Sequence, residues 1–402
     1  MEKVYIVAAK RTPIGSFGGS LKDMSAGLLG SIAIKAALEQ ASLDADRVDE
    51  VIVGNVIGAG QGMGVGRQAS LYAGIPDSVP AYSLNMVCGS GMKTVMDAVS
   101  HIRAGDASVV VAAGVEVMSQ IPFSVPSTMR DGHKMGNLSL TDLLINDGLT
   151  DVYNQYHMGK TAENVAQMVG VSRAQQDEYA LSSQMKAATA IEAGKFKDEI
   201  VAVEVKQRKE TKVFDTDEYP KASATLAGLE KLRPAFEKEG TVTAGNASGI
   251  NDGASAVIVV SESAVKAHGL KPLAEIVSYA QSGIDPKVMG LGPVEAVTQA
   301  VTKAGINLGD IDVYELNEAF AAQALGVIHK LAENHEVGVS SILDKANVNG
   351  GAIALGHPLG ASGNRIIVSL VHELNRIQGD YGVASLCVGG GMGTAILIKS
   401  IA

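Results

Sequence analysis

Continuous apolar runs along the chain alternate with segments whose apolar residues recur at helical spacing. The runs cover residues 3–9, 48–53, 108–113, 254–261, 274–280, 312–316 and 383–387. Helical spacing is found in residues 24–41, 92–102, 293–304 and 364–377. Fully apolar strands between helices are typical of sheets covered on both faces. The pattern therefore predicts an α/β fold with mixed, mostly parallel sheets.

The pattern changes between about residues 120 and 240. Residues 121–136 mix Pro, Ser, Met and basic residues, and residues 195–221 are densely charged without a sustained apolar period. Two helices are predicted in between, over residues 159–168 and 173–193, the second favoured by Ser172 and an acidic first turn. Alternation over residues 199–208 predicts an exposed strand. This part of the chain is interpreted as an insertion on the α/β core.

Two parts of the chain resemble each other. Residues 90–114 and residues 362–389 share the order Ser-Gly, helix, Gly-Asp, apolar strand and glycine. Residues 43–53 and 306–316 both end as a short strand after an Asp-containing turn. Such self-similarity predicts duplicated halves. If the halves pack about a pseudo-two-fold axis, equivalent helix starts converge and bring Cys88 near His357.

Composition limits the class of protein. The chain has 402 residues, of which 46% are hydrophobic and 19% charged, which indicates a well-filled globular protein. A net charge of −10 disfavours a nucleic-acid or anionic-membrane binder. Two cysteines argue against a disulfide framework and favour a reducing compartment. No run approaches the roughly 20 apolar residues of a membrane span, and the first run is too short for a signal peptide. We expect a cytoplasmic protein.

Cys88 comes just before the helical pattern that starts near Met92. The positive end of a helix dipole favours a thiolate and lowers a thiol pKa. Gly89 and Gly91 let the backbone turn sharply and approach a ligand. A nucleophilic cysteine is therefore one interpretation, and a small buried apolar residue is the other.

Three further polar residues adjoin strand ends or helix starts. Each has an ordinary explanation: Asn317 as the cap of a helix beginning at Glu318, His357 as a satisfied loop histidine, and Cys387 as a buried strand residue. Together they favour a site, because a Cys/His pair is a known way to activate a nucleophile. Zinc is disfavoured, since no CxxC or paired histidine spacing is present. Glycine-rich residues 58–64 follow the second strand and so lack the context of a dinucleotide-binding loop.

Four spaced motifs resemble those of the thiolase family, in the family's order, and the likeness runs from Arg11 to Gly393. They are residues 85–91 (NMVCGSG), 317–320 (NEAF), 356–363 (GHPLGASG) and 387–391 (CVGGG). The resemblance implies duplicated α/β halves in a layered α-β-α-β-α arrangement with an inserted loop domain. Residues 1–119 plus 241–270 would form the N-terminal half, residues 120–240 the inserted domain and residues 271–402 the C-terminal half.

The resemblance also implies a reaction: reversible condensation of two acetyl-CoA to acetoacetyl-CoA and CoA by a ping-pong route. Cys88 would accept the acetyl group, His357 would activate it, and Cys387 would move the proton of the second acetyl-CoA. One oxyanion hole would use the His357 ring and a water held by Asn317. The other would use the N–H groups of Cys88 and Gly389. The implied enzyme needs no metal and no cofactor, because the CoA thioester is the substrate.

The inserted domain would hold CoA, and eight residues correspond to the family's substrate contacts. His157 and Ser248 would contact the pantetheine arm, Leu149 and Phe320 its tunnel, Met158 and Met289 the acetyl group, with Ala319 beside them. Lys221 stands where relatives often carry arginine against the adenine, and lysine lacks a planar stacking face, so looser nucleotide binding is expected. Residues 121–136 correspond to the loop that pairs dimers in family tetramers, which implies a homotetramer. Val115 replaces the second glycine of a usual pair, with no consequence that we can assign.

Alternatives remain within and outside the reaction class. Ketoacyl synthases and hydroxymethylglutaryl-CoA synthases share the architecture but lack the second cysteine, so Cys387 disfavours them. A degradative 3-ketoacyl-CoA thiolase for longer chains is the second alternative, and only motif details distinguish it from the biosynthetic type. Residues 87–91 (VCGSG) and 156–159 (YHMG) resemble the biosynthetic type. A non-catalytic acyl-CoA or lipid carrier on the same scaffold is the third possibility.

Overall fold

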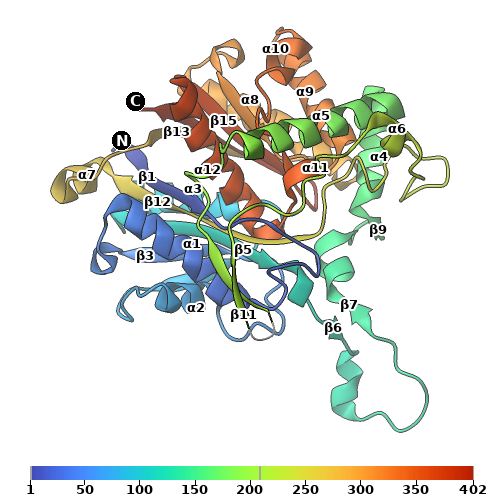
Figure 1. The fold of residues 1–402 in the computed structure, drawn as a ribbon, viewed down its shortest axis with the longest axis horizontal. Coiled ribbons are helices and arrows are strands. Elements are labelled where there is room, and N and C mark those ends of the chain that lie inside the picture. The colour runs from blue at the N-terminus through green and yellow to red at the C-terminus, as the bar shows by residue number, and fades with distance from the viewer. Residues whose placement is uncertain (1, 208–209, 402) are drawn as a thin grey trace.

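The computed structural model describes residues 2–207 and 210–401. Within these residues one ten-stranded sheet runs through the molecule in the order β14-β15-β16-β13-β1-β12-β5-β3-β4, with β2 beside β12 (Figure 1). Its strands are β1 (Val4–Arg11), β2 (Gly15–Ser16), β3 (Glu50–Gly54), β4 (Ala81–Leu84), β5 (Val109–Val117), β12 (Asn251–Ser261), β13 (Ala274–Gly283), β14 (Val313–Leu316), β15 (Tyr381–Val388) and β16 (Met392–Ser400).

The sheet is mixed, and its parallel pairs lie at the two ends. Strand β3 is parallel to both β4 and β5, and β14 is parallel to β15. The central pairs are antiparallel, because β1, β12, β13 and β16 reverse direction between neighbours. The pairing of Tyr5 with Glu275 and of Ile6 with Ala274 joins the two halves into one sheet.

Helices fill three layers around the two halves of the sheet. They are α1 (Ala26–Ala41), α2 (Val65–Tyr72), α3 (Ser90–Ala104), α4 (Met158–Val169), α5 (Arg173–Glu192), α6 (Leu226–Glu230), α7 (Glu262–His268), α8 (Gly292–Ala304), α9 (Ala321–Asn334), α10 (Val339–Leu343), α11 (Ala352–Leu355) and α12 (Leu359–Ile377). α1 and α2 share an apolar core with the N-terminal strands, and α8 and α9 share one with the C-terminal strands. A third core combines α3 and α12 with strands of both halves, which confirms the α-β-α-β-α layering.

The duplicated elements occupy equivalent places. α3 leads into β5, which is parallel to β3, and α12 leads into β15, which is parallel to β14. The two helices touch at their first turns: a Cβ added at Gly91 would lie 2.7 Å from the Gly360 carbonyl oxygen, and one at Gly363 would lie 2.5 Å from the Met92 nitrogen. Glycine is required at both contacts. The predicted convergence of equivalent helix starts is confirmed.

The middle of the chain adds α4, α5 and α6, the hairpin of β10 (Val203–Gln207) and β11 (Glu210–Phe214), and two short pairs. These pairs are β6 (Phe123–Ser124) with β7 (Thr141–Asp142), and β8 (Thr150–Asp151) with β9 (Tyr156–His157). The segment between β6 and β7 projects away from the body (Figure 1) and is called the arm, residues 123–142.

Four local predictions differ from the structure. Ser172 caps α5, but through a capping box with Gln175, since the first turn holds no acidic residue. The strand predicted as exposed over residues 199–208 buries Val203 and Val205 in the apolar core that contains α1. Arg208, the last residue of that prediction, lies outside the described residues. α12 starts at Leu359, five residues early, and β16 was not predicted. No helix in the described ranges is long and apolar enough to cross a membrane.

Candidate active site

Cys88 lies on a strained turn between β4 and α3. Val87 has φ +46°, a left-handed conformation that a β-branched residue rarely adopts. The Ser90 hydroxyl accepts the Met86 N–H at 2.8 Å and donates to the Val87 carbonyl at 2.7 Å. Asn85 Oδ1 accepts the Val87 N–H at 2.8 Å. These bonds hold the turn, which presents Cys88 directly before the helix.

A second turn, at the end of β15, packs against the Cys88 turn. The backbone N–H groups of Gly389 and of Cys88 itself lie near enough to the Cys88 sulfur to act against the rise of its pKa. A Cβ added at Gly89 would lie 2.8 Å from Val388 Cγ2, and one at Gly389 would lie 3.2 Å from Val87 Cγ1. Glycines at both positions therefore permit the approach. The close packing of the two turns brings the Gly389 N–H group near the Cys88 sulfur.

Burial controls the ionisation of both thiols. It raises the pKa of Cys88 to about 11, against the opposing effect of the two N–H groups, and the Glu116 charge raises that pKa further. The expectation that the helix start lowers the pKa of Cys88 is therefore wrong, because desolvation outweighs the amides. Burial and the nearby Cys88 also raise the pKa of Cys387. Both cysteines are free thiols, and their raised pKa values keep them protonated at neutral pH.

His357 is buried, and its ring is held in one orientation. Burial, helped by the positive charge of Arg365, lowers the pKa of His357 to about 4, so the ring is neutral at pH 7. Its Nδ1 lies 2.6 Å from the Ser362 hydroxyl, which donates its single hydrogen to the Pro358 carbonyl at 2.9 Å. Nδ1–H must therefore donate to Ser362. Nε2 is left as a bare acceptor, and it has no partner among the described residues.

The loop carrying His357 reaches the same end of the molecule as Cys88. Leu359, two residues after His357, shares an apolar cluster with Cys88 and Leu149. The His357 N–H donates to Asn251 Oδ1 at 3.1 Å, which fixes the loop on β12. Asn251 and Ser362 were not singled out from the sequence, although Ser362 stands inside a recognised motif.

Asn317 follows β14 beside the end of β15. Its N–H donates to the Ser385 carbonyl at 2.9 Å, and Ser385 is two residues before Cys387. Both side-chain atoms, Oδ1 and Nδ2, are buried without a partner among the residues described. The simple capping explanation is wrong, because α9 begins at Ala321 and the amide bonds no helix N–H. A buried amide with open hydrogen-bonding capacity suits a polar ligand or water.

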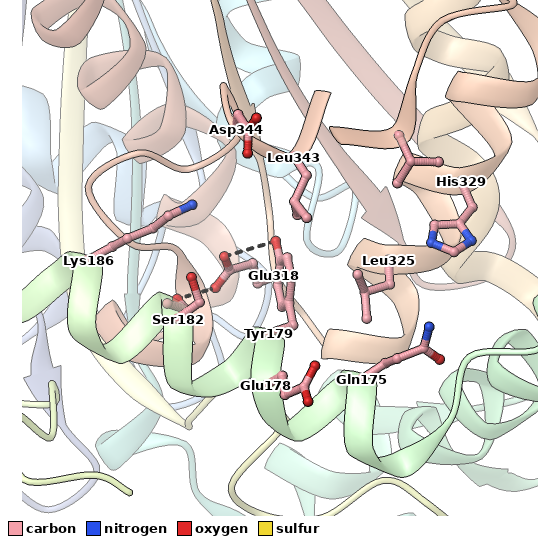
Figure 2. A pocket seen from close by; sticks show the side chains of 12 residues that line it. Gln175, Glu178, Tyr179, Ser182, Lys186, Glu318, Leu325, His329, Leu343 and Asp344 are labelled. Atoms are coloured by element: carbon pink, nitrogen blue, oxygen red, sulfur yellow. Dashed lines mark hydrogen bonds between the residues drawn. The ribbon is translucent and has the colours of Figure 1, made fainter. Parts of the chain in front are cut away.

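Glu318 anchors the Asn317 loop to α5. Its carboxylate accepts from the Ser183 hydroxyl at 2.7 Å, the Tyr179 hydroxyl at 3.2 Å and Asn347 Nδ2 at 2.8 Å. Figure 2 shows this carboxylate beside a cavity of about 450 Å³ lined by residues of α5, α9 and α10. Neither cysteine lines that cavity, so the cavity is separate from the thiol site.

Cys387 belongs to a cluster of apolar side chains. Met158, Met289, Ala319 and Phe320 share one cluster with it. The same cluster includes Phe236, whose ring stacks on His157 at 4.6 Å and meets Phe320 edge-on at 6.1 Å. His157 accepts the Gly159 N–H on Nδ1 at 3.0 Å. Sequence reasoning missed Phe236, because it stands in a charged stretch without a period.

Ser248 and Lys221 are linked to each other through Tyr219, and Ser248 is linked to Ala319 of this cluster. The Ser248 N–H donates to the Ala319 carbonyl at 2.9 Å. The exposed Lys221 ammonium lies 5.6 Å from the centre of the Tyr219 ring. That ring packs so closely on Gly249 that a Cβ there would lie 2.4 Å from it. The structure thus groups Lys221, Tyr219 and Ser248, with Tyr219 again missed from the sequence.

Among residues 2–207 and 210–401, no group of three or more His, Cys, Asp or Glu side chains is arranged to hold a metal ion.

Fold and site together define a class of thiol-dependent acyl-transfer enzymes built on duplicated α/β halves. Residues 4–263 match the thiolase N-terminal domain, and residues 270–400 match the thiolase C-terminal domain. The chain belongs to the thiolase family.

Relatives match over the whole chain. An acetyl-CoA acetyltransferase of Chromobacterium violaceum is 54% identical, with 99% of both chains covered. The structure of an acetyl-CoA acetyltransferase from Syntrophomonas wolfei superposes with a TM-score of 0.96 at 40% identity, covering 100% of both chains. The structure of human mitochondrial 3-ketoacyl-CoA thiolase in complex with CoA gives a TM-score of 0.93 at 47% identity, covering 100% of this chain and 98% of the other.

Proposed function

We propose that the protein is an acetyl-CoA C-acetyltransferase that condenses two acetyl-CoA to acetoacetyl-CoA and CoA, reversibly and through an acetyl-Cys88 thioester. The observation that carries the proposal is the meeting of two thiols and two backbone N–H groups where the Cys88 and Gly389 turns pack together. Full-length relatives named acetyl-CoA acetyltransferase support the substrate.

The first half-reaction acetylates Cys88. As the sulfur attacks the acetyl carbonyl carbon, its proton passes to His357 Nε2, the open acceptor of the ring. The N–H groups of Cys88 and Gly389 stabilise the oxyanion of the tetrahedral intermediate. The bond between the acetyl carbon and the CoA sulfur breaks, and the leaving CoA thiolate takes a proton from Cys387.

The second half-reaction forms the carbon–carbon bond. The Cys387 thiolate removes a proton from the methyl group of the second acetyl-CoA, and its raised pKa makes it a strong base for a weak carbon acid. The protonated His357 Nε2 and a water held by Asn317 stabilise the enolate oxygen. The enolate carbon attacks acetyl-Cys88, the thioester bond breaks, and the Cys88 sulfur recovers its proton from His357. All three groups return to their starting states.

CoA binding falls to the inserted domain, residues 120–240, with help from both halves. The insertion interrupts the N-terminal half of residues 1–119 plus 241–270, and residues 271–402 form the C-terminal half. His157 and Ser248 contact the pantetheine arm, supported by their packing on Phe236 and Ala319. Leu149 and Phe320 line the tunnel, while Met158 and Met289 flank the acetyl group. Lys221, whose ammonium lies over the Tyr219 ring, lies near the nucleotide.

The enzyme uses no cofactor beyond the CoA thioester. Because both cysteines act as thiols, a reducing compartment suits them, and we place the protein in the cytoplasm. The arm would pair two dimers into a homotetramer.

Intact-protein mass after mixing with acetyl-CoA, with acetoacetyl-CoA thiolysis followed in parallel, tests the function. The wild type should gain one acetyl group and turn over, and Cys88→Ala should do neither. Cys387→Ala is the matched control, because it retains the nucleophile: it should acetylate but not condense.

No adduct and no turnover by the wild type would favour a non-catalytic acyl-CoA carrier. Faster thiolysis of long-chain 3-ketoacyl-CoA than of acetoacetyl-CoA would favour a degradative thiolase.

A further inference from the structure

Glu116 is a buried carboxylate near Cys88 that the reaction above does not use. It lies on β5 and is only 1% exposed. Within the described part of the chain it forms no ion pair, because no Lys, Arg or His lies within 4.0 Å of it. An isolated buried charge is costly unless its oxygens are hydrogen-bonded.

Four donors satisfy the carboxylate. Oε1 accepts Asn55 Nδ2 at 3.0 Å and the Ile57 N–H at 3.1 Å. Oε2 accepts the Val56 N–H at 3.0 Å and the Gly360 N–H at 2.9 Å. Every partner is an N–H donor, so both oxygens accept, which favours the ionised carboxylate. Burial nevertheless raises the pKa of Glu116 to about 7, against the opposing effect of the Val56, Ile57 and Gly360 N–H groups, so the carboxylate is mostly ionised only above that pH.

The donors come from two segments that lead to different catalytic groups. On one side, the Val56 carbonyl accepts Asn85 Nδ2 at 3.1 Å, and Asn85 Oδ1 holds the strained Val87 next to Cys88. On the other side, Gly360 lies in the first turn of α12, three residues after His357. A Cβ at Gly360 would lie 2.8 Å from Glu116 Oε2, so the glycine permits the contact.

We propose that Glu116 is a positioning residue for the reaction at Cys88, which ties the Cys88 turn and the His357 loop to one carboxylate and so fixes the nucleophile against its base. This inference rests on the proposed function. The electrostatic effect of Glu116 opposes catalysis, since its charge raises the pKa of Cys88. Glu116 therefore serves the reaction by holding the Cys88 turn and the His357 loop in place, and not by its charge.

Two variants separate geometry from charge. Glu116→Gln removes the charge but keeps the length, and its NH₂ faces two N–H donors. Glu116→Asp keeps the charge but draws the oxygens back by one methylene, so they no longer span both segments. Misplacement by about 1 Å costs roughly 100-fold in rate, so both variants should lose between about 10- and 100-fold in kcat with little change in KM.

Alkylation of Cys88 by iodoacetamide at pH 8 is the second readout, and it requires no turnover. Glu116→Gln should alkylate faster than the wild type, because the neighbouring charge is gone, while Glu116→Asp should not. Glu373→Gln is the matched control: Glu373 is 3% exposed and accepts from Asn349 and Arg376, away from Cys88. It should lower thermal stability without lowering kcat.

Wild-type kcat in both Glu116 variants would overturn the proposal. Loss in Glu116→Gln alone would also overturn it, because unchanged kcat in Glu116→Asp would show that the carboxylate need not span both segments. A kcat loss in Glu373→Gln equal to that of the Glu116 variants would also overturn it, by showing a general loss of stability. Absence of thiolysis by the wild type would instead refute the proposed function.

Discussion

At the scale of single residues, Cys88 and His357 are both neutral at rest. The pKa of Cys88 is raised to about 11 and that of His357 is lowered to about 4, both mainly by burial. Between these values the thiol keeps its proton and the imidazole lacks one. A thiolate at Cys88 with an imidazolium at His357 is therefore not the resting state.

This state predicts the pH dependence of Cys88 alkylation. Iodoacetamide reacts with thiolate, and the thiolate fraction below a raised pKa is smaller than that of an ordinary cysteine. The rate at Cys88, measured by peptide mass, should rise about tenfold per pH unit from pH 7 to 10 and level off only above about 11. His357 adds no step between pH 6 and 9, because it is already neutral there. A plateau reached by pH 8 would contradict this, with Cys88→Ala as the control for other sites.

The sequence identifies these residues but not their ionisation. Cys88, His357 and Cys387 stand in recognisable motifs, whereas the desolvation that sets their pKa values comes from segments far away in the chain. Phe236, Tyr219 and Glu116 belong to no periodic pattern, and only the folded structure places them at the site.

At the scale of elements, the junction of α3 and α12 sets the geometry of the site. The helices touch through glycines in their first turns, so Cys88 and the His357 loop move with them. The glycine-rich start of α12 has poor helix propensity, and its Gly360 N–H is held by Glu116. This explains why the apolar pattern predicts the start of α12 five residues late.

Gly91→Ala should disturb this junction. Its Cβ would lie 2.7 Å from the Gly360 carbonyl oxygen and 2.8 Å from the Asn364 nitrogen, and backbone atoms cannot yield as a side chain does. Overpacking of this kind costs about 1–3 kcal/mol, measurable by urea unfolding, and thiolysis should fall with it. Gly309→Ala is the control, since a Cβ there has no atom within 4 Å. Equal stability of the two variants would show that the helices do not require close contact.

At the scale of the whole molecule, the internal repeat predicts two α/β halves, and the structure confirms them. The antiparallel centre of the sheet was beyond sequence reasoning, because strands buried on both faces show the same apolar run in either direction. The join of β1 to β13 depends on pairing between residues about 270 positions apart, which no local pattern reports.

The arm is the part of the molecule whose role depends most on assembly. It projects from the body (Figure 1), and Phe123, Met135 and Leu140 on it are 62%, 91% and 62% exposed. Apolar side chains gathered on a projection indicate an interface. Because Ser124 pairs with Thr141, residues 125–140 can be replaced by a two-residue turn without parting the strands.

If the arm pairs dimers, this excision should reduce the assembly from four chains to two in light scattering. The excised protein should keep the acetylation of Cys88, because the Cys88 and Gly389 turns lie on other elements. Met135→Ser should weaken the tetramer in the same direction. Met168→Ser, on α4 and also 60% exposed, should not. A tetramer that survives the excision would assign its interface to another surface, and a wild type of two chains would leave the arm free to contact something other than a second dimer.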